Sequence, residues 1–471
     1  MSGLGLLGTM EMARNAMQTA RQGAEIAGHN LANASNPIYA RQRVKISAAV
    51  AIPTDKGPQG SGSEVARLEQ IRDYAIDKAL VSEKSVTAYL EAKQRQLRRA
   101  ETALGQTIDR QNIDAGESYS QYGVAEGLTG LFNSFQALSA NPTSTAERQT
   151  ALFNAQKLSD KFNALDRRLT DLRKSVNEEV SDEITNINVK LEEVAYLAAS
   201  IGNTELVEGA ANEVRDAMQH SLEELSQYVN ISTSTNDDGK LSVFVDGVEM
   251  VTANAMTNSV QLATDANGMH SLAEANGDPI ELKSGSLKGL IDVRDNSITD
   301  LQDRLNTLAT SLIGQVNSLH QTGYDLTGTN DNTRVFFTGT NASDISVNSD
   351  LIDDPRKLQA ASTAEVGDNG VIRSIAALGN TVVTGLGSMT FSEHYGNTIS
   401  RFGQDMALTD TQLKDQHAVQ TMLEKQRDSV QGVSIDEEVA NLVIYQRAFQ
   451  ASARLITTMD KLMGDVINMQ R

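Results

Sequence analysis

The side chains that could carry chemistry are spread along this chain without forming a catalytic pattern. The histidines are His29, His220, His270, His320, His394 and His417. No two of them stand at the spacing of a metal site, and the helical HExxH zinc motif does not occur. Cysteine is absent, which excludes disulfides, thiolate metal sites and cysteine catalysis. We therefore predict no metal site, no cofactor and no enzyme activity.

The paired carboxylates lead to the same expectation. Glu178-Glu179 and Glu192-Glu193 are pairs of sequence neighbours within a segment of helical period. Neighbouring residues on a helix do not face each other, so neither pair can act together on one substrate. The sequence therefore shows no group of residues that could carry out acid–base catalysis.

The stretch "AGHNLANASNPIYARQRV", residues 27–44, is the most unusual local sequence. Asn30, Asn33 and Asn36 follow an apolar run, and Pro37 then pushes Asn36 out of the helical region. Asparagine tolerates left-handed backbone and bonds its own backbone, which suits a sharp turn. Two interpretations are open: an active-site loop, or a joint in a terminal segment that self-assembles.

A heptad pattern precedes this stretch and predicts the helix that positions it. Its first row is Met10, Met17, Ala24 and Leu31. Its second row is mainly alanine: Leu6, Ala13, Ala20, Ala27 and Ala34. Small residues allow close helix approach but bury little apolar area, so this helix should be weak alone. We expect extended chain after it, in YARQRVKIS, and a linker or loop over residues 52–63.

A second heptad pattern occupies the C-terminal region. Apolar residues recur every seven positions: Ile435, Leu442, Phe449, Ile456 and Met463. Ser434, with Glu437 three residues later, has the pattern of a capping box at the helix start. The periodicity leaves three arrangements open: the two terminal helices pair with each other, they pair with other subunits, or each packs on an ordinary core.

Long helices are predicted between the two ends. Apolar residues step by three or four from Leu158 to Ile201, with Gly202 as the expected stop, and a helix of that length spans about 66 Å. Similar patterns cover residues 90–104, 206–229 and 298–319. Aromatic residues make up only 4% of the chain, which also favours a core of packed helices.

In one central region the apolar residues no longer recur at the helical spacing of three or four. In "NDDGKLSVFVDGVEMVT", Asp246-Gly247 lies between two β-rich runs, which is typical of a hairpin. "GMHSLAEANGDPIELKSG" is expected to form a second hairpin or a bent strand pair. The predicted fold class is mainly α with inserted β: an elongated multi-domain protein, with a long helical bundle built from the N- and C-terminal halves and a small mainly-β domain in the middle.

These patterns divide the chain into five expected segments. They are an N-terminal helix and extended arm (1–60), the first half of a helical rod (61–230), an inserted β domain (231–285), the second half of the rod with a short β or irregular stretch near 324–350 (286–430), and a C-terminal heptad helix (431–471).

The net charge and the hydropathy narrow the possible partners. The chain of 471 residues has a formal net charge of −20, whereas nucleic-acid binding needs a cationic face. No run of ~18 apolar residues is present to span a membrane. The N-terminus lacks the basic start, apolar block and cleavage site of a signal peptide. We expect no nucleic acid and no membrane as partners.

The joint stretch resembles the signature of the flagellar axial proteins, the family of rod, hook and hook-associated proteins. The matching residues are Asn30, Leu31, Ala32, Asn33, Pro37, Tyr39, Arg41 and Gln42. Ile38 stands where the family usually has glycine, and isoleucine resists the positive φ that glycine permits. "VSIDEEVANLVIYQRAFQASARLITTMDKLMGDVINM" (433–469) and "GSLKGLIDVRD" (285–295) are similar to the hook-associated members that join hook to filament.

This resemblance implies a structural protein of the bacterial flagellum, located outside the cell and exported unfolded by the flagellar type III apparatus. It implies that the terminal helices fold on assembly into coiled-coil layers around an axial channel. Tyr39, Arg41 and Gln42 would contact neighbouring subunits. The implied partners are further copies of the chain, the flagellar hook protein, a second junction hook-associated protein, and an export chaperone at the C-terminal helix.

Other classes of protein remain as alternatives. Another axial protein, hook-like or flagellin-like, would share the terminal patterns but differ in position and copy number. A secreted coiled-coil scaffold or adhesin would explain the heptads but not the Asn-Pro-Tyr-Arg-Gln step. A secreted enzyme would need a catalytic cluster within residues 231–285 or 324–400.

Overall fold

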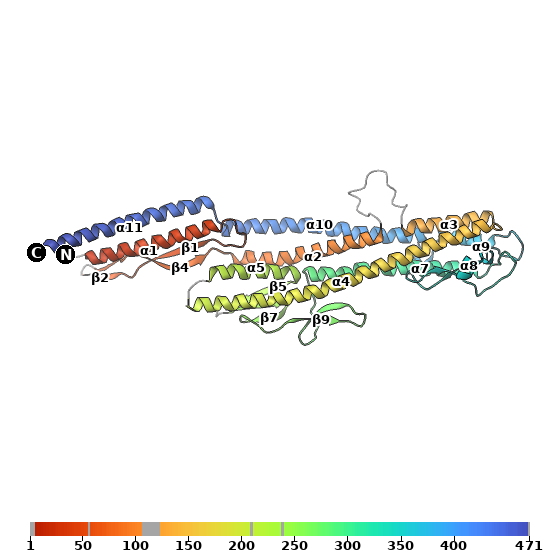
Figure 1. The fold of residues 1–471 in the computed structure, drawn as a ribbon, viewed down its shortest axis with the longest axis horizontal. Coiled ribbons are helices and arrows are strands. Elements are labelled where there is room, and N and C mark those ends of the chain that lie inside the picture. The colour runs from red at the N-terminus through yellow and green to blue at the C-terminus, as the bar shows by residue number, and fades with distance from the viewer. Residues whose placement is uncertain (1–4, 55–56, 106–122, 208–210, 237–239, 470–471) are drawn as a thin grey trace.

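The computed structural model describes residues 5–54, 57–105, 123–207, 211–236 and 240–469. Within these ranges the molecule is long and narrow, and the two ends of the chain lie together at one end of it (Figure 1). Most of its length is built from long helices that run side by side, with small sheets attached. The predicted elongated, mainly helical fold with inserted β structure is therefore confirmed.

The end that carries both termini is a separate packing unit. It contains helix α1 (Leu6–Ala32), helix α11 (Ile435–Met469), and the antiparallel strands β1 (Gln42–Ala48) and β4 (Ser63–Gln70). A small hairpin, β2 (Ile52–Thr54) with β3 (Gly57–Gln59), lies where the composition suggested a linker. Helix α1 packs against α11, β1 and β4. We call this set of elements the terminal unit.

The rod is the remaining helical body. Its long helices are α2 (Tyr74–Leu104), α3 (Val124–Ala140), α4 (Thr145–Val207), α5 (Asn212–Tyr228), α7 (Ile298–His320) and α10 (Phe391–Gln431). A short helix α6 (Ser286–Asp292) and the π-helical segment η1 (Val293–Ser297) lead into α7. The core runs along α4, whose Phe162, Val176 and Leu191 are fully buried. The three-and-four spacing therefore marks the face that α2, α3, α5 and α7 cover.

Helix α4 does not end at Gly202, so the expected stop is wrong. The helix continues to Val207, and its 63 residues correspond to about 95 Å. A glycine inside a helix costs only about 1 kcal/mol and does not by itself terminate it. A Cβ on Gly202 would lie 3.3 Å from the side-chain nitrogen of Asn254, so this glycine makes room for a neighbouring turn.

Between α5 and α6, the described residues form six strands. Strands β5 (Ile231–Thr235), β6 (Leu241–Val245), β7 (Val248–Thr252) and β8 (Ala255–Met256) form one antiparallel sheet in that order. The turn at Asp246-Gly247 connects β6 to β7, with φ of 47° and 96°. The predicted second strand pair is present, because the chain turns after β10 (His270–Glu274) and Ala273 forms an antiparallel bridge with Pro279. Strand β10 also pairs antiparallel with β9 (Val260–Thr264), which precedes the predicted stretch.

Short elements cover the end of the rod that lies far from the termini (Figure 1). The strands are β11 (Phe337–Thr338) and β12 (Ser346–Val347), and the helices are α8 (Ser349–Asp353) and α9 (Gly370–Ala377). Single 3-10 turns lie at η2 (Pro355–Lys357), η3 (Leu378–Asn380) and η4 (Thr384–Leu386). No helix in the described part of the chain is long and apolar enough to cross a membrane.

Candidate functional site

The two terminal helices pair with each other along their length. The alanine row of α1 is the buried one: Ala13, Ala20 and Ala27 are at most 3% exposed. The first row, Met10, Met17 and Leu31, is half-buried beside it. The closest approach is at Gly23, where an added Cβ would lie 2.5 Å from the ring of Tyr445. Small residues on α1 therefore allow α11 to approach closely.

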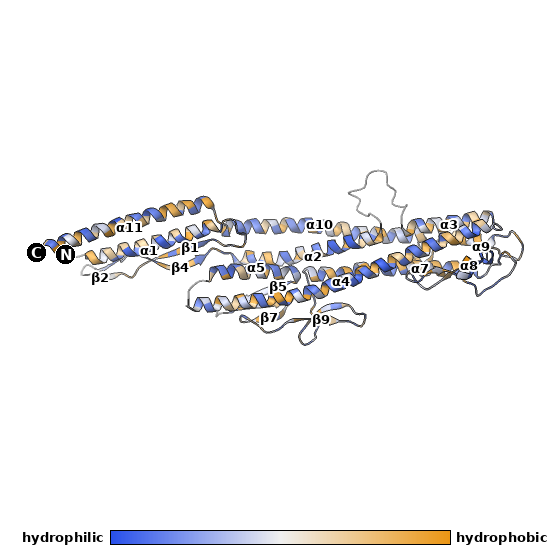
Figure 2. Ribbon diagram, in the orientation of Figure 1, coloured by the Kyte–Doolittle hydropathy of each residue, from blue (hydrophilic) through white to orange (hydrophobic). Residues whose placement is uncertain are grey.

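Pairing with α1 covers only one face of α11. In the predicted heptad stripe, Leu442, Ile456 and Met463 are half-buried, whereas Ile435 and Phe449 stay exposed. Further apolar side chains on α11 are exposed, among them Ile444 (61%), Leu462 (43%) and Val466 (49%). Figure 2 shows apolar residues along the whole length of this helix. The terminal unit thus presents unpaired apolar surface.

The joint loop, which we define as residues 33–41 between α1 and β1, is organised around Asn30. This side chain is 1% exposed and lies in the last turns of α1. Its Nδ2 donates to the Gln42 carbonyl oxygen at 2.8 Å, and its Oδ1 accepts from the Gln42 amide at 3.0 Å. The Tyr39 hydroxyl donates to the same Oδ1 at 2.7 Å. One buried asparagine therefore fixes both the start of β1 and the tyrosine of the joint loop.

The other asparagines act through side-chain hydrogen bonds and not through left-handed backbone. Asn33 Nδ2 donates to the His29 carbonyl oxygen at 3.0 Å, and Asn36 Oδ1 accepts from the Ile38 amide at 3.3 Å. Of the described residues other than glycine, positive φ occurs only at Asp246, Ala253, Asn254 and Ser388. The expected left-handed turn is therefore absent, and Ile38 occupies the usual glycine position without backbone strain.

The joint loop lies against the first turns of α5. Asp216 Oδ2 accepts from the Ala40 amide at 3.3 Å. Asn212 Nδ2 donates to Gln42 Oε1 at 3.1 Å, and Gln42 Nε2 donates to Glu213 Oε1 at 3.4 Å. We expected Tyr39, Arg41 and Gln42 to contact neighbouring subunits. In the structure, Tyr39 and Gln42 are buried, and their polar groups bind within the chain.

Arg41 connects the joint loop to the start of α11. Its Nε lies 2.7 Å from Glu438 Oε1, and its Nη1 lies 2.7 Å from Glu437 Oε2. Its amide donates to the Gln431 carbonyl oxygen at the end of α10. Only half of the predicted capping box is formed: the Glu437 amide meets Ser434 Oγ at 3.5 Å, while the Glu437 carboxylate binds Arg41.

Buried charges surround this contact. Burial raises the pKa of Asp216 to about 6, although the nearby Arg72 guanidinium lowers it in part. Burial also raises the pKa of Asp77. The pKa of the Tyr39 hydroxyl is raised by burial and by the facing carboxylates of Asp216 and Glu213. Burial alone would raise the pKa of Glu223 as well, but Lys84 and Arg427 hold it below its usual range. The joint therefore lies over carboxylates of which some are poorly compensated.

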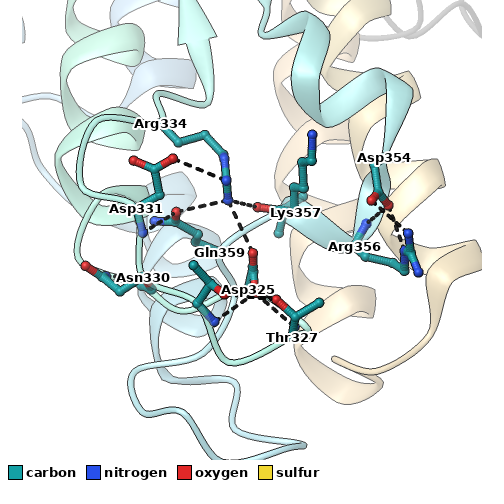
Figure 3. Close-up of polar contacts among 12 residues, drawn as sticks. Asp325, Thr327, Asn330, Asp331, Arg334, Asp354, Arg356, Lys357 and Gln359 are labelled. Carbon is teal, nitrogen blue, oxygen red and sulfur yellow. Dashed lines mark hydrogen bonds and ion pairs between the residues drawn. The ribbon is translucent and has the colours of Figure 1, made fainter.

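A second polar cluster lies at the opposite end of the rod (Figure 3). Arg334 is its centre: it contacts Asp325 at 3.3 Å, Asp331 at 3.2 Å and the Lys357 carbonyl oxygen at 3.2 Å. The Gln359 Oε1 accepts from the Asp331 amide at 3.1 Å. These contacts connect loops to one another, which gives the cluster a structural role.

Neither cluster has the composition of a catalytic or metal site. In the described ranges, no three His, Asp or Glu side chains are placed to hold a metal ion. The Asp216 carboxylate accepts hydrogen bonds from the Ala40 amide, Gln70 and Arg72, and only a small cavity adjoins it. The arrangement can hold the terminal unit against the rod.

The partners of the joint motif were not predicted from the sequence. Asn212 and Asp216 on α5 and Glu438 on α11 are all buried polar residues. Asn212 and Asp216 share one helix face at the i, i+4 spacing, yet that spacing is common on solvated helices and indicates no partner.

Comparison with known proteins gives matches in two separate regions. The family model of the flagellar hook-associated protein FlgK helical domain matches residues 111–337. The model of the flagellar basal body rod FlgEFG protein C-terminal region matches residues 426–469. The second match covers the end of α10 and all of α11.

Relatives align over almost the whole chain. Flagellar hook-associated protein 1 from Bacillus subtilis (strain 168) is 24% identical over 516 residues, which cover 98% of this chain and 97% of the relative. The protein of that name from Escherichia coli (strain K12) is 23% identical over 554 residues, covering 97% and 99%. A solved structure, that of the flagellar hook junction protein FlgK from Burkholderia pseudomallei, aligns with 24% identity and a TM-score of 0.47 over 55% of this chain and 46% of that chain. Two models of flagellar protein families thus match separate regions of this chain, and relatives of one name align with it from end to end, so the chain is similar to flagellar hook-associated protein 1 over nearly its whole length.

Proposed function

We propose that this protein forms the junction between the flagellar hook and the filament, where subunits assemble through their terminal units. The observation that carries the proposal is the incomplete burial of α11. Its pairing with α1 leaves Ile444, Leu462 and Val466 exposed on the same helix. Apolar surface in a continuous helical stripe is costly in water and is buried when further helices pack against it. Copies of the same two-helix unit supply such helices.

The incomplete burial of α11 also supports folding of the terminal unit on assembly. Apart from Glu438, no residue of α11 is buried in the described chain, and the buried row of α1 is alanine. Little apolar area therefore stabilises the pair, and a free subunit gains little from forming it. We propose that the terminal unit becomes fully ordered only between neighbouring subunits, after export from the cell.

The partners follow from the proposed position. Further copies of this chain form a ring or tube, with the flagellar hook protein on one side and a second junction hook-associated protein on the other. An export chaperone would cover the apolar face of α11 before assembly. The five segments with boundaries at residues 60, 230, 285 and 430 are proposed as the functional division, with 1–60 and 431–471 as the assembly segments.

Immunogold electron microscopy of sheared, intact flagella tests the position of the protein. Antibody to this chain should label one narrow band where the hook meets the filament. Label along the whole hook or filament would instead identify a bulk axial protein, hook-like or flagellin-like. The absence of label on any flagellum would reject the assignment and favour the secreted scaffold or adhesin.

Substitutions on α11 test the mechanism. Changing Ile444 and Leu462 together to serine should remove the band, because the exposed apolar face would no longer favour a neighbouring helix. The control is Val366→Ser, an apolar residue that is even more exposed (83%) and lies at the far end of the rod. Loss of the band in both variants, or in neither, would contradict assembly through α11.

A further inference from the structure

Two surface turns flank strand β10, and both contain the sequence Ala-Asn-Gly. The first holds Asn267 and Gly268 and follows β9, and the second holds Asn276 and Gly277 and follows β10. Both asparagines are exposed, and both glycines have positive φ, 79° and 91°. Asparagine followed by glycine is prone to lose its side-chain ammonia, because no side chain on glycine hinders attack of its nitrogen on the asparagine Cγ.

The two turns have the same backbone frame. The Gly268 amide donates to the Asp265 carbonyl oxygen at 3.0 Å, and the Gly277 amide donates to the Glu274 carbonyl oxygen at 2.9 Å. Attack by either glycine nitrogen requires this hydrogen bond to open, so the cost of opening is similar in both turns. A difference in reactivity between the turns must therefore come from the two asparagine side chains.

The Asn276 side chain is directed forward along the chain. Its Oδ1 accepts from the Asp278 amide at 3.0 Å, and its Nδ2 donates to Asp278 Oδ2 at 2.9 Å. An asparagine oxygen that accepts from the amide two residues on forms an Asx turn, which lays the side chain beside the intervening peptide. The carbon that is attacked therefore lies close to the Gly277 nitrogen that attacks it.

Asp278 also supplies two groups that suit the reaction. Its amide donates to Asn276 Oδ1, the atom on which negative charge develops when the glycine nitrogen attacks. Its carboxylate accepts from Nδ2, the nitrogen that leaves. The carboxylate stabilises the positive charge that this nitrogen gains as it takes up a proton.

Asn267 is held in the opposite direction. Asp265 Oδ1 accepts from the Asn267 amide and from the Met269 amide, both at 2.8 Å. The Asn267 side chain also hydrogen-bonds to the Asp265 carboxylate. This side chain is therefore bonded to a residue that precedes it, and the hydrogen bonds that favour attack at Asn276 are not reproduced at Asn267.

The third Asn-Gly pair of the sequence is Asn369-Gly370 at the start of α9. Asn369 Nδ2 donates to the Ser139 carbonyl oxygen at 2.6 Å, which fixes the side chain against another helix. The Gly370 amide donates to Asp368 Oδ1 at 2.9 Å. A carboxylate facing this amide opposes the loss of its proton, because the nitrogen would become negative beside a negative group.

We propose that Asn276 is a site of spontaneous covalent modification, promoted by Asp278, at which the chain converts asparagine to aspartate or isoaspartate. The Gly277 nitrogen loses its proton to hydroxide and bonds to Asn276 Cγ. The Cγ–Nδ2 bond breaks, Nδ2 takes a proton from water and leaves as ammonia, and a cyclic succinimide remains. Water then opens the ring at either of its carbonyl carbons. The reaction is a property of the single chain and does not depend on the proposed junction position.

Conversion changes the turn itself. An oxygen replaces Nδ2, so a second carboxylate faces Asp278 Oδ2 where the unmodified amide donates at 2.9 Å. Like charges this close repel each other. Isoaspartate also inserts an extra carbon into the main chain between Glu274 and Asp278, where the Glu274 amide donates to the Asp278 carbonyl oxygen at 2.8 Å. The return of the chain from β10 to Pro279 should therefore loosen as the protein ages.

Mass spectrometry of the full-length chain, incubated at neutral pH in heavy-oxygen water, follows the three sites together. Opening of the succinimide incorporates oxygen from water, so the label marks conversions that took place during the incubation. Cleavage after glutamate places Asn267 and Asn276 on separate peptides, because Glu274 lies between them. Asn276 should convert about tenfold faster than Asn267, the factor that one additional hydrogen bond in the transition state supplies, and Asn369 should be the slowest.

The unfolded chain is the reference for this ratio. In guanidinium chloride the side-chain hydrogen bonds are lost, and the three sites should react at similar rates because glycine follows each asparagine. If Asn276 is no faster than Asn267 in the folded chain, or if the same ratio persists in the unfolded chain, the turn does not set the rate and the proposal is wrong.

Two matched substitutions test the role of Asp278. Asp278→Ala removes the carboxylate but keeps the amide, so conversion at Asn276 should slow to about the rate at Asn267. Asp278→Asn keeps an oxygen that accepts from Nδ2 and should restore part of the rate. Asp265→Ala is the control in the other turn: it should speed conversion at Asn267 and leave Asn276 unchanged. An unchanged rate at Asn276 in Asp278→Ala, or equal slowing in Asp265→Ala, would overturn this role.

Discussion

Gly23 of α1 lies directly beneath the ring of Tyr445 of α11, where a Cβ would come within 2.6 Å of three ring atoms. This contact sets how closely the two terminal helices approach. Gly23→Ala should force the ring away and destabilise the pair by about 1–3 kcal/mol, as expected for overpacking. Hydrogen exchange along α1 measures the effect as faster exchange.

Gly28 provides the control for this prediction. It lies in the same helix, and nothing lies within 4 Å of the position that its Cβ would take. Gly28→Ala should slow exchange in α1, since alanine is favoured in helices by about 1 kcal/mol. Similar effects of the two substitutions would show that the Tyr445 contact does not determine the pairing.

Removal of the Arg41 side chain should destabilise the start of α11. Glu438 is 3% exposed and depends on Arg41 Nε at 2.7 Å, so Arg41→Ala leaves a buried carboxylate unpaired. Breaking one partner of a buried ion pair costs about 3–5 kcal/mol. The Glu438 amide, which binds the Ser434 carbonyl oxygen, should then exchange much faster.

The specificity of this pair is tested by two further substitutions. Arg41→Lys should restore part of the protection, because an ammonium keeps the charge but cannot contact both Glu437 and Glu438 as a planar fork. Arg43→Ala removes an arginine whose side chain is 63% exposed and should leave the Glu438 amide unchanged. A loss of protection in Arg43→Ala as large as in Arg41→Ala would count against the buried pair.

His320 should make the far end of the rod sensitive to acid. The side chain is fully buried, its Nδ1 donates to the Arg334 carbonyl oxygen at 3.0 Å, and its Nε2 accepts from the Gln359 amide at 3.0 Å. Burial lowers its pKa from 6.5 to about 4, so the folded state takes up its proton less readily than the unfolded state. Stability is therefore present above pH 6.5 and falls as the pH drops toward 4.

Urea unfolding followed by circular dichroism checks this sign. The wild-type rod should lose about 2 kcal/mol through His320 between about pH 7.5 and 5.0. His320→Gln should be less stable at neutral pH but should lose less on acidification. His417→Gln, at a histidine whose side chain is 49% exposed, should keep the wild-type pH profile. Identical profiles for wild type and His320→Gln would rule out this origin of acid sensitivity.

Glu183 has the opposite pH effect. Burial raises its pKa from 4.5 to about 7, while the Ser286 hydroxyl, which donates to Oε2 at 2.8 Å, offsets this only in part. The folded state therefore favours the protonated acid, and this contribution to stability is lost as the pH rises through about 7. Glu183→Gln should stabilise the rod, by about 2 kcal/mol more at pH 8 than at pH 5. Urea midpoints at the two pH values measure the difference, and an equal gain at both would contradict it.

The sequence by itself determined the helices. The heptads of α1 and α11 and the three-and-four spacing of α4 are local periodicities, and a helix needs no distant partner to express them. Asn36-Pro37 excludes helix at Asn36 for a steric reason that acts between neighbouring residues, although α1 already ends at Ala32. The resemblance of residues 28–44 and 433–469 to axial proteins was likewise visible in the printed letters.

The tertiary structure alone decided what the joint contacts. Ala40 and Asp216 are 176 residues apart, and Arg41 and Glu437 are 396 apart, so no local pattern connects either pair. The pairing of β10 with β9 likewise joins it to a strand that lies before the predicted hairpin. In each case, several segments of similar local propensity could have been the partner. Only packing of the whole chain distinguishes them, because burial and hydrogen bonding across distant segments carry the free-energy difference.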